Sequence, residues 1–421
     1  MSRRRADVIE NPAMIQESPV EAGAGASERI YALDGLRTTM LFFVVLFHCL
    51  LSYIVAPSRN WRFKDEMTTP VADLVVAFIH AFTLPTFFML AGFFSAMLYL
   101  RRGAEMFARN RALRIALPFA VGWTILHPVV GAGYVFANGV QSGSLGDGLA
   151  AAGAALVDGS LLFRDSTLHL WFMYDLLFFY AIALVLAPMV MRVPAAWRER
   201  ALALFGSGIA RPWLRLPLLA LMTFGMLRMV GGTLYASLSF VPNWRLLLGY
   251  GMYFGFGWLL YLKRDLIRGF ERFAWTHAIL GLAIFLLTLP VVRLLTEGPL
   301  RRPAFILVSM AVSATVVWLL FFGLTGLFLR HFNRPSPAVR YVVDASFWVY
   351  LVHLPLTIWL PGVFSNLAWL PSLKILMVLA ITLLFGFVTY DLFVRSTIVG
   401  SVLNGRRYPR VLFGTNRPVP A

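Results

Sequence analysis

The stretch RTTMLFFVVLFH, from Arg37 to His48, carries a guanidinium and an imidazole at the two ends of an uncharged hydrophobic segment. An α-helix rises about 1.5 Å per residue, so the two side chains would be separated by roughly 16 Å. That distance is about half of the hydrocarbon core of a bilayer. The pattern predicts a helix that begins at a membrane surface with Arg37 and buries His48 partway through the membrane.

The composition of the whole chain also indicates a membrane protein. Of the 421 residues, 59% are hydrophobic and 14% are charged, whereas soluble domains carry about 25% charged residues. The mean hydropathy is +0.74, and long apolar runs recur along the chain. We therefore expect an all-α integral membrane protein whose surroundings are the lipid bilayer.

Apolar runs of spanning length predict ten transmembrane helices. The absence of a clear internal repeat argues against an inverted-repeat transporter. The predicted spans are 38–56, 73–100, 112–136, 167–191, 213–230, 246–262, 273–295, 304–329, 341–360 and 371–394.

The formal net charge of +17 is explained by membrane topology. If the N-terminus is cytoplasmic, most of the 37 Lys and Arg residues fall on the inner side, as the positive-inside rule requires. We therefore predict that both termini are cytoplasmic and that nucleic acid is not a partner. Residues 1–29 are expected to be a disordered tail, 30–395 the membrane domain and 396–421 a C-terminal tail.

Three connections between the predicted spans are long. Residues 192–212 are rich in arginine and are interpreted as an inner loop. Residues 57–72 and 137–166 are the longest outer connections. The second is too mixed in composition to span, so we expect it to cap a site as a loop or a short interfacial helix.

An ionisable side chain inside a predicted span is costly, so each one is a candidate for function. Counted from the outer helix ends, His48, His80, Asp175 and His353 fall at a similar depth, roughly 10–12 Å below the surface. This common depth predicts a shared cavity. The alternative is that each histidine only satisfies a neighbouring carbonyl or hydroxyl across helices.

The remaining histidines and the cysteine receive no catalytic assignment. His169 is interpreted as an interfacial residue at the outer boundary, and His127, His277 and His331 are given no role. The single Cys49 excludes intramolecular disulfides and a multi-cysteine metal site, so no metal site is predicted.

A second set of candidates lies at the inner surface. The run RNRALR places Arg111 and Arg114 three residues apart, on one face of a helix, with Arg109 close by and Arg37 on the same side. Converging arginines can bind phosphates through charge-assisted bidentate hydrogen bonds, although such pairs also arise from the positive-inside bias alone. Nearby aspartates are expected to pair with arginines: Asp34, Asp344 and Asp391.

Four segments, in this order, resemble membrane acyltransferase family 3, and in particular its osmoregulated periplasmic glucan succinyltransferase branch. The similarity covers roughly residues 30–395. The segments are YALDGLR…VVLFH (31–48), FIHAFTLPTFFMLAGFFSAMLYLR (78–101), HLWFMYDLLFFY (169–180) and DASFWVYLVHLPLTIWL (344–360).

The resemblance implies an enzyme of the bacterial inner membrane that moves an acyl group from cytoplasmic acyl-CoA to a hydroxyl of a periplasmic glucan or other envelope glycan. No permanently bound cofactor is implied. Arg111 and Arg114 match the donor-binding arginines of the family, and Arg37 and His48 match its signature pair. Members move acetyl, succinyl and other groups, so succinyl rests on similarity alone. Asp175 is not carried over from the family.

Simple chemistry fits this expectation. The anionic part of coenzyme A would stay at the inner arginines while the pantetheine arm carries the thioester into the membrane. His48 would then act as general base toward a sugar hydroxyl, or as a nucleophile that forms an acyl-imidazole. Asp175 or another buried polar group is expected to orient the ring, and His80 or His353 to stabilise the oxyanion.

Two other functions agree with the same residues. One is an O-acetyltransferase that acts on lipopolysaccharide or another envelope glycan. The other is a non-enzymatic glycan transporter in which the buried histidines relay protons.

Outer aromatic and basic residues add weaker indications. A succinyl carboxylate would need a cation, for which Arg228 or Arg245 is a candidate. Four tryptophans are candidates for stacking on sugars, or simply mark the membrane interface: Trp61, Trp171, Trp244 and Trp369.

Overall fold

The computed structural model describes residues 31–58, 60–161, 166–297 and 302–412. Within these ranges the chain forms helices and no strands, which confirms the all-α prediction. The predicted tail 1–29 lies outside the described residues. The helices are α1 (Tyr31–Leu50), α2 (Pro70–Arg111), α3 (Leu117–Ser142), α4 (Leu145–Val157), α5 (Trp171–Met191), α6 (Ala195–Ala210), α7 (Pro212–Val230), α8 (Trp244–Leu262), α9 (Ala274–Glu297), α10 (Arg302–His331), α11 (Pro337–Phe364), α12 (Pro371–Thr389) and α13 (Ile398–Asn404).

Eight helical stretches among the described residues are long and apolar enough to cross a membrane. One of them, Pro70–Ser142, is 73 residues long and contains the predicted spans 73–100 and 112–136. The 19-residue helix α8 overlaps the predicted span 246–262 but is not among the eight. A multi-pass membrane protein is therefore confirmed, while the count of ten spans and the cytoplasmic position of both termini stay predictions.

The turn between α2 and α3 positions the predicted donor arginines. Gly103 interrupts α2 with φ 78, a left-handed conformation that glycine adopts without strain. A π-helical turn, Ala112–Ala116, then leads into α3. A π-turn has more residues per turn than an α-helix, so the angle between Arg111 and Arg114 around the helix axis is wider than the expected α-helical spacing.

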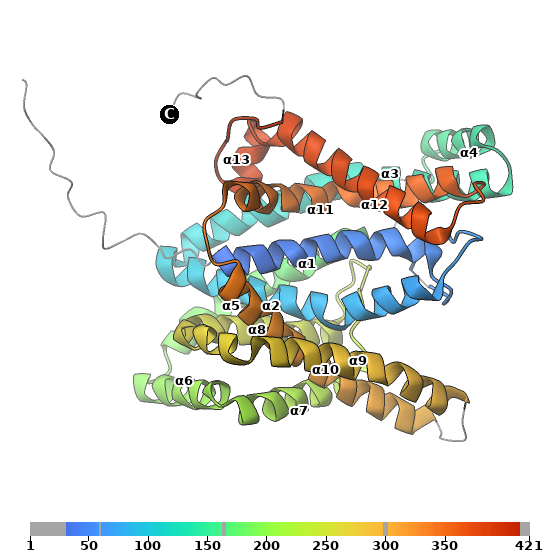
Figure 1. The fold of residues 1–421 in the computed structure, drawn as a ribbon. Coiled ribbons are helices and arrows are strands. Elements are labelled where there is room, and N and C mark those ends of the chain that lie inside the picture. Colours follow the sequence, from blue (N-terminus) through green and yellow to red (C-terminus); the bar gives the residue numbers. More distant parts are fainter. Residues whose placement is uncertain (1–30, 59, 162–165, 298–301, 413–421) are drawn as a thin grey trace, which may run out of the picture. The chain divides into compact units, whose positions relative to one another are not determined.

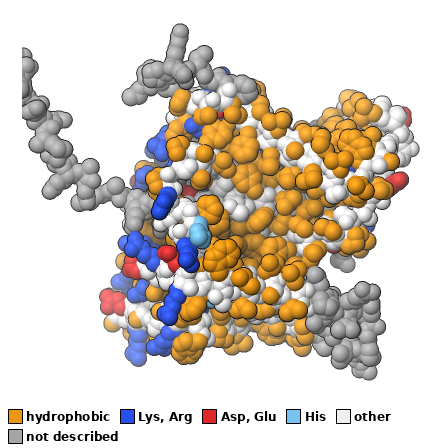
Figure 2. Space-filling model, in the orientation of Figure 1, with side chains coloured by type: hydrophobic (Ala, Val, Ile, Leu, Met, Phe, Trp, Pro, Cys, Tyr) orange, Lys and Arg blue, Asp and Glu red, His pale blue; other side chains and the backbone are white. Residues whose placement is uncertain are grey.

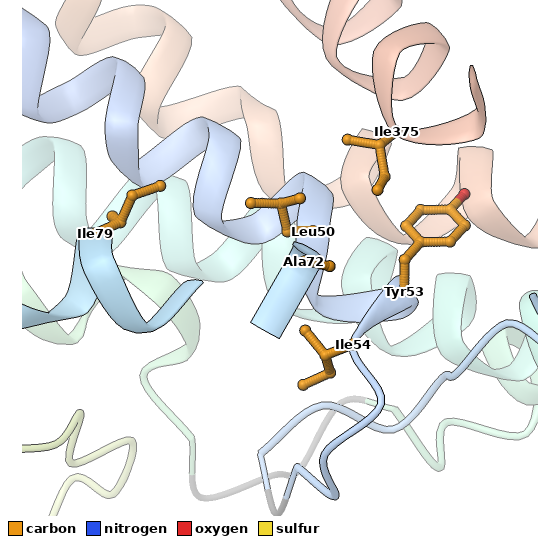
Figure 3. Packing of buried hydrophobic residues seen from close by; sticks show 6 residues of the cluster. All are labelled: Leu50, Tyr53, Ile54, Ala72, Ile79 and Ile375. Carbon is orange, nitrogen blue, oxygen red and sulfur yellow. The ribbon is translucent and has the colours of Figure 1, made fainter. Parts of the chain in front are cut away.

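Helix α1 lies in the middle of the described fold and contacts α2, α10, α11 and α12 (Figure 1). Where α1 ends, its apolar side chains meet those of α2 and α12. Figure 3 shows this cluster, in which Tyr53 and Ala72 are fully buried. The packing holds the end of α1, and with it His48, against its neighbours. The cluster consists of Leu50, Tyr53, Ile54, Ala72, Ile79 and Ile375.

Helices α2 and α8 approach each other closely through glycines. A Cβ atom on Gly92 would collide with the carbonyl oxygen of Phe254, and one on Gly257 with the carbonyl oxygen of Met89. Small residues at such contacts let two backbones touch, and in a membrane this dispersion packing is a main source of helix association. The α2–α8 pair therefore forms a rigid wall beside α1.

Three segments that lie between or after the predicted spans contain helices. Within the predicted outer loop 137–166, α3 continues to Ser142 and the apolar α4 follows, so the short-helix alternative is confirmed there. The predicted inner loop 192–212 contains α6, because its Ala-, Leu-, Arg- and Glu-rich sequence favours a helix. The predicted C-terminal tail contains α13.

Basic side chains gather at one end of the described fold. Figure 2 shows Lys and Arg concentrated toward the end where α1 begins, while most of the remaining visible face is hydrophobic. This asymmetry agrees with the charge bias in the sequence.

We expect Gly257→Ala to lower the stability of the protein by about 1–3 kcal/mol, because its methyl group would press on the backbone of α2. The control is Gly255→Ala on the same helix, where a Cβ meets nothing within 4 Å. Thermal unfolding of the detergent-solubilised variants measures the difference. Equal melting temperatures for the two variants would contradict the close α2–α8 contact.

Candidate active site

A cavity of about 480 Å³ lies near the end of α1 that is opposite Arg37. Its wall is formed by α1, α2, α3, α5 and α11, together with the loops that follow α1 and α7. Four histidines line it: His48, His80, His127 and His169. The structure thus brings His48 and His80 into one cavity, as their common depth predicted.

His48 has one ring nitrogen engaged and one free within the described residues. Its Nδ1 lies 2.8 Å from the carbonyl oxygen of Val44 and 3.1 Å from Nε2 of His353. The other nitrogen, Nε2, makes no hydrogen bond to any described residue, and the ring lines the cavity. This is the arrangement that a general base needs.

The neighbouring carbonyls determine where the protons sit in the uncharged rings. Nδ1 of His353 lies 2.6 Å from the carbonyl oxygen of Tyr350 and, since a carbonyl can only accept, carries a proton. Nε2 of His353 is then an acceptor. The Nδ1–H of His48 is shared between Val44 and His353, so Nε2 of His48 carries the lone pair.

His353 is therefore the direct neighbour of His48, with ring centroids 4.9 Å apart. It is completely buried and does not line the cavity itself. It contacts Nδ1 of His48, whereas the free nitrogen of His48 is Nε2. This position suits a group that orients His48, while its predicted role at the oxyanion has no contact to support it.

The structure places His169 in the same cluster, whereas the sequence interpretation made it an interfacial residue. It is buried, and its ring centroid lies 6.5 Å from that of His48 and 5.0 Å from that of His353. Its Nε2–H donates to the carbonyl of Leu351 at 3.1 Å. The HLW motif at residues 169–171 was the sequence signal for His169. The position of His169 at the end of a predicted span, however, predicts neither its burial nor its partners.

His80 and His127 form other parts of the cavity wall. The Nε2–H of His80 donates to the carbonyl of Leu234 at 2.9 Å, which ties α2 to the loop after α7. His127, which received no role from the sequence, bonds through Nδ1 to the carbonyl of Leu161 at 3.2 Å. Both contacts match the alternative reading, in which histidines satisfy carbonyls across helices.

Asp175 is buried on α5 but does not line the cavity. The structure therefore does not bring it together with the histidines, although the depth estimate placed it level with them. The depth of a residue along a helix does not determine where its side chain points around the helix axis. Asp175 therefore shares the predicted depth of the histidines without lining the cavity. The group that contacts His48 is His353.

The loop after α1 contributes an aromatic wall. The indole N–H of Trp61 donates to Ser52 at 2.9 Å, and its ring lies 5.9 Å from that of His48 and 5.7 Å from that of Tyr134. Trp171 also lines the cavity, whereas Trp244 and Trp369 do not. Two of the four candidate tryptophans thus line the cavity.

A buried ion pair holds this loop in place. Nζ of Lys374, on α12, lies 2.9 and 3.0 Å from the two carboxylate oxygens of Asp65, and both side chains are fully buried. The backbone N–H of Asp65 also donates to the carbonyl of Ser52. Burial raises the pKa of Asp65, while the hydrogen bond from Lys374 acts in the opposite direction. The sequence analysis missed this pair, although a lysine inside a predicted span is a clear signal.

At the other end of α1, four arginines form an arginine cluster: Arg37, Arg102, Arg111 and Arg114. The charges of the other three act on Arg114. Arg111 donates to Ser95 at 3.3 Å and stacks on the ring of Tyr180 at 4.8 Å. The predicted donor arginines are therefore close in space, with repulsion that an anion would relieve.

The predicted pairing of aspartates with arginines is seen at Asp34 and Asp344. Asp34 lies 3.4 Å from Arg37, and Asp344 lies 2.8 Å from Arg340. The carboxylate of Asp391 accepts the backbone N–H groups of Val411 and Leu412. All three thus bind groups near the end where α1 begins.

A free imidazole nitrogen that faces a cavity can accept a proton. The fold and the cavity thus define a multi-pass membrane protein with a histidine-lined cavity. The acyltransferase domain family matches residues 30–391, which is most of the chain. The chain belongs to this family and is an acyltransferase, which confirms the resemblance seen in the sequence.

Its curated relatives include proteins named glucans biosynthesis protein C. The one from Salmonella paratyphi A is 24% identical over 393 residues, which cover 90% of this chain and 95% of the relative. The one from Salmonella typhimurium is 24% identical over 400 residues with the same shares. The Escherichia coli protein is 29% identical over 100 residues, or 24% of this chain and 25% of the relative. No solved structure matches the chain.

We expect Lys374→Met to lower the stability by about 3–5 kcal/mol at neutral pH, because it leaves the Asp65 carboxylate buried without a partner. Burial raises the pKa of Asp65, and the variant loses the hydrogen bond and the charge of Lys374, which act in the opposite direction. The unpaired carboxyl is neutral at low pH, so the loss should be small there and grow as the pH rises through this pKa. Melting temperatures measured across the pH range test this.

The double variant Asp65→Asn/Lys374→Met is the control, since it removes both charges together. It should recover much of the stability at neutral pH and lose the added pH dependence. A single and a double variant with identical pH profiles would show that the ion pair does not carry the effect.

Proposed function

We propose that this acyltransferase resides in the bacterial inner membrane and moves an acyl group, succinyl in the first instance, from cytoplasmic acyl-CoA to a hydroxyl of a periplasmic glucan. Support comes from the family, from the names of the relatives and from the site. The observation that carries the proposal is the free Nε2 of His48 on a cavity of about 480 Å³. That volume lies within the range of small-ligand sites.

In the proposed reaction, Nε2 of His48 removes the proton from the sugar hydroxyl while the hydroxyl oxygen attacks the thioester carbon. The tetrahedral intermediate then collapses, the carbon–sulfur bond breaks, and the thiolate leaves. The proton on Nε2 passes to the departing sulfur, which gives free coenzyme A and the uncharged ring. Through its acceptor Nε2, His353 holds the Nδ1–H of His48 and stabilises the imidazolium that forms between the two steps.

The length of α1 determines how the donor would lie. Eleven helical steps lead from Arg37 to His48, a rise of roughly 16 Å along the helix. The phosphates would bind the arginine cluster, and the extended pantetheine arm would bring the thioester to the histidine. The acceptor would enter at the other end, beside Trp61 and Trp171.

For a succinyl donor, the cation that faces the cavity is Arg62. Among the described residues of the cavity wall, it is the one guanidinium. Arg228 and Arg245, the candidates from the sequence, do not line the cavity, and Arg245 stacks on Trp244 instead. A carboxylate at the far end of the acyl chain would pair with Arg62.

Replacing His48 by Ala tests the enzyme proposal. We expect the acyl content of isolated periplasmic glucans to fall to the level of cells without the protein, because loss of a general base costs about 10²–10⁴ in rate. Cys49→Ala, one residue further along the same helix, is the control and should leave acylation largely intact. Normal acylation by His48→Ala at equal membrane levels would remove His48 from the mechanism.

The same experiment separates the alternatives. A transporter would deliver glucan without acyl groups in both strains. An envelope O-acetyltransferase would leave the glucan unchanged and alter the acetyl content of lipopolysaccharide or another envelope glycan. Mass spectrometry of the glycans from each strain reads both outcomes.

Replacing Arg62 by Gln tests the class of acyl group. We expect the KM for succinyl-CoA to rise about tenfold while the KM for acetyl-CoA changes little, since the succinyl group carries a carboxylate and the acetyl group does not. Arg245→Gln is the matched control, because this arginine does not line the cavity. Equal changes for both donors would place Arg62 outside the acyl subsite.

A further inference from the structure

The C-terminal segment 395–412, here named the strap, folds back onto the end of the molecule where α1 begins. It contains α13, which packs on the π-turn Ala112–Ala116 and on α11. Figure 1 shows α13 beside that end of the helices. The strap thus lies against the segment that carries Arg114.

Several hydrogen bonds hold the strap in this position. Nε of Arg395 donates to the carbonyl of Pro409 at 2.7 Å, and the N–H of Tyr408 donates back to the carbonyl of Arg395 at 2.9 Å. Arg340, on α11, donates to the hydroxyl of Tyr408 at 2.9 Å. Asp391 anchors the last described turn through two backbone N–H groups. The strap is therefore a bonded part of the fold.

Gly405 brings the strap into contact with the arginine cluster. It caps α13 in the left-handed conformation, with φ 81. The guanidinium of Arg114 lies directly against it, and a Cβ at this position would collide with Nη2 of Arg114. Glycine at residue 405 thus leaves the space that the guanidinium occupies.

The strap carries positive charge of its own. The guanidinium groups of Arg395 and Arg406 stack on the ring of Tyr408, at 5.1 and 4.9 Å, and their charges act on Asp344 of α11. In the arginine cluster itself, the buried Nε of Arg111 has no hydrogen-bond partner in the described structure. An unsatisfied donor among mutually repelling guanidinium groups favours the binding of an anion.

We infer that the strap completes the binding site for the phosphorylated nucleotide part of coenzyme A, with Gly405 positioning the Arg114 guanidinium. This rests on the proposed function. The shared chemistry is a phosphate anion, which an anionic lipid headgroup also supplies. The strap thereby makes donor binding depend on a segment some 290 residues beyond Arg114 in the sequence.

The test measures binding of coenzyme A itself to the full chain in phosphatidylcholine nanodiscs, so it needs no acyl transfer. We expect Gly405→Ala and Gly405→Asn to weaken the Kd about tenfold or more, because both displace the Arg114 guanidinium. Asn accepts the left-handed conformation, so this variant keeps the fold if Ala strains it. The matched control is Gly231→Ala, another left-handed helix cap at which a Cβ meets nothing within 4 Å.

Each outcome decides the inference. Weakened binding in the Gly405 variants alone supports it, and unchanged binding in folded Gly405 variants overturns it. If the wild type ignores coenzyme A but retains phosphatidylglycerol in a Gly405-dependent manner, the anion site stands with a lipid ligand and the proposed donor is wrong. If neither ligand binds, the strap inference is overturned, while the acylation assay on His48→Ala decides the proposed function separately.

Discussion

Hydrocarbon offers no hydrogen bonds, so a polar group buried in this protein is stabilised when the chain itself supplies its partner. The histidines follow this constraint: His48, His80 and His169 each use one ring nitrogen on a backbone carbonyl of a helix or loop. Bonding one nitrogen defines the tautomer and leaves the other available. At His48 the available nitrogen, Nε2, faces the cavity, where it can accept a proton.

The same constraint links distant segments. Lys374 on α12 and Asp65 in the loop after α1 can be buried only as a pair, so the cavity wall that carries Trp61 cannot be separated from α12. Close glycine contacts join α2 to α8 without polar groups, and α2 in turn contacts α1.

Some residues of the candidate site could be predicted from the sequence, and others could not. His48, His80 and His353 were identified because an ionisable side chain in an apolar run is costly, and this holds whatever the fold. Asp175 met the same criterion and yet lies away from the cavity, since depth gives no direction around a helix. His169 and His127 were overlooked because their burial depends on neighbours from α11 and the loop after α4. The pairing of Lys374 with Asp65 joins residues 309 positions apart, a contact that no local pattern encodes.

The sequence alone therefore determined the membrane class, the positions of most long helices, the charged end and the family, because hydrophobicity, charge and short motifs are local properties. Only the tertiary structure decided which nitrogen of His48 is free, that His353 is its neighbour, and that a C-terminal glycine lies against Arg114. Those features depend on helix rotation and on contacts between segments far apart in the chain. Packing sets both, and packing is a property of the whole fold.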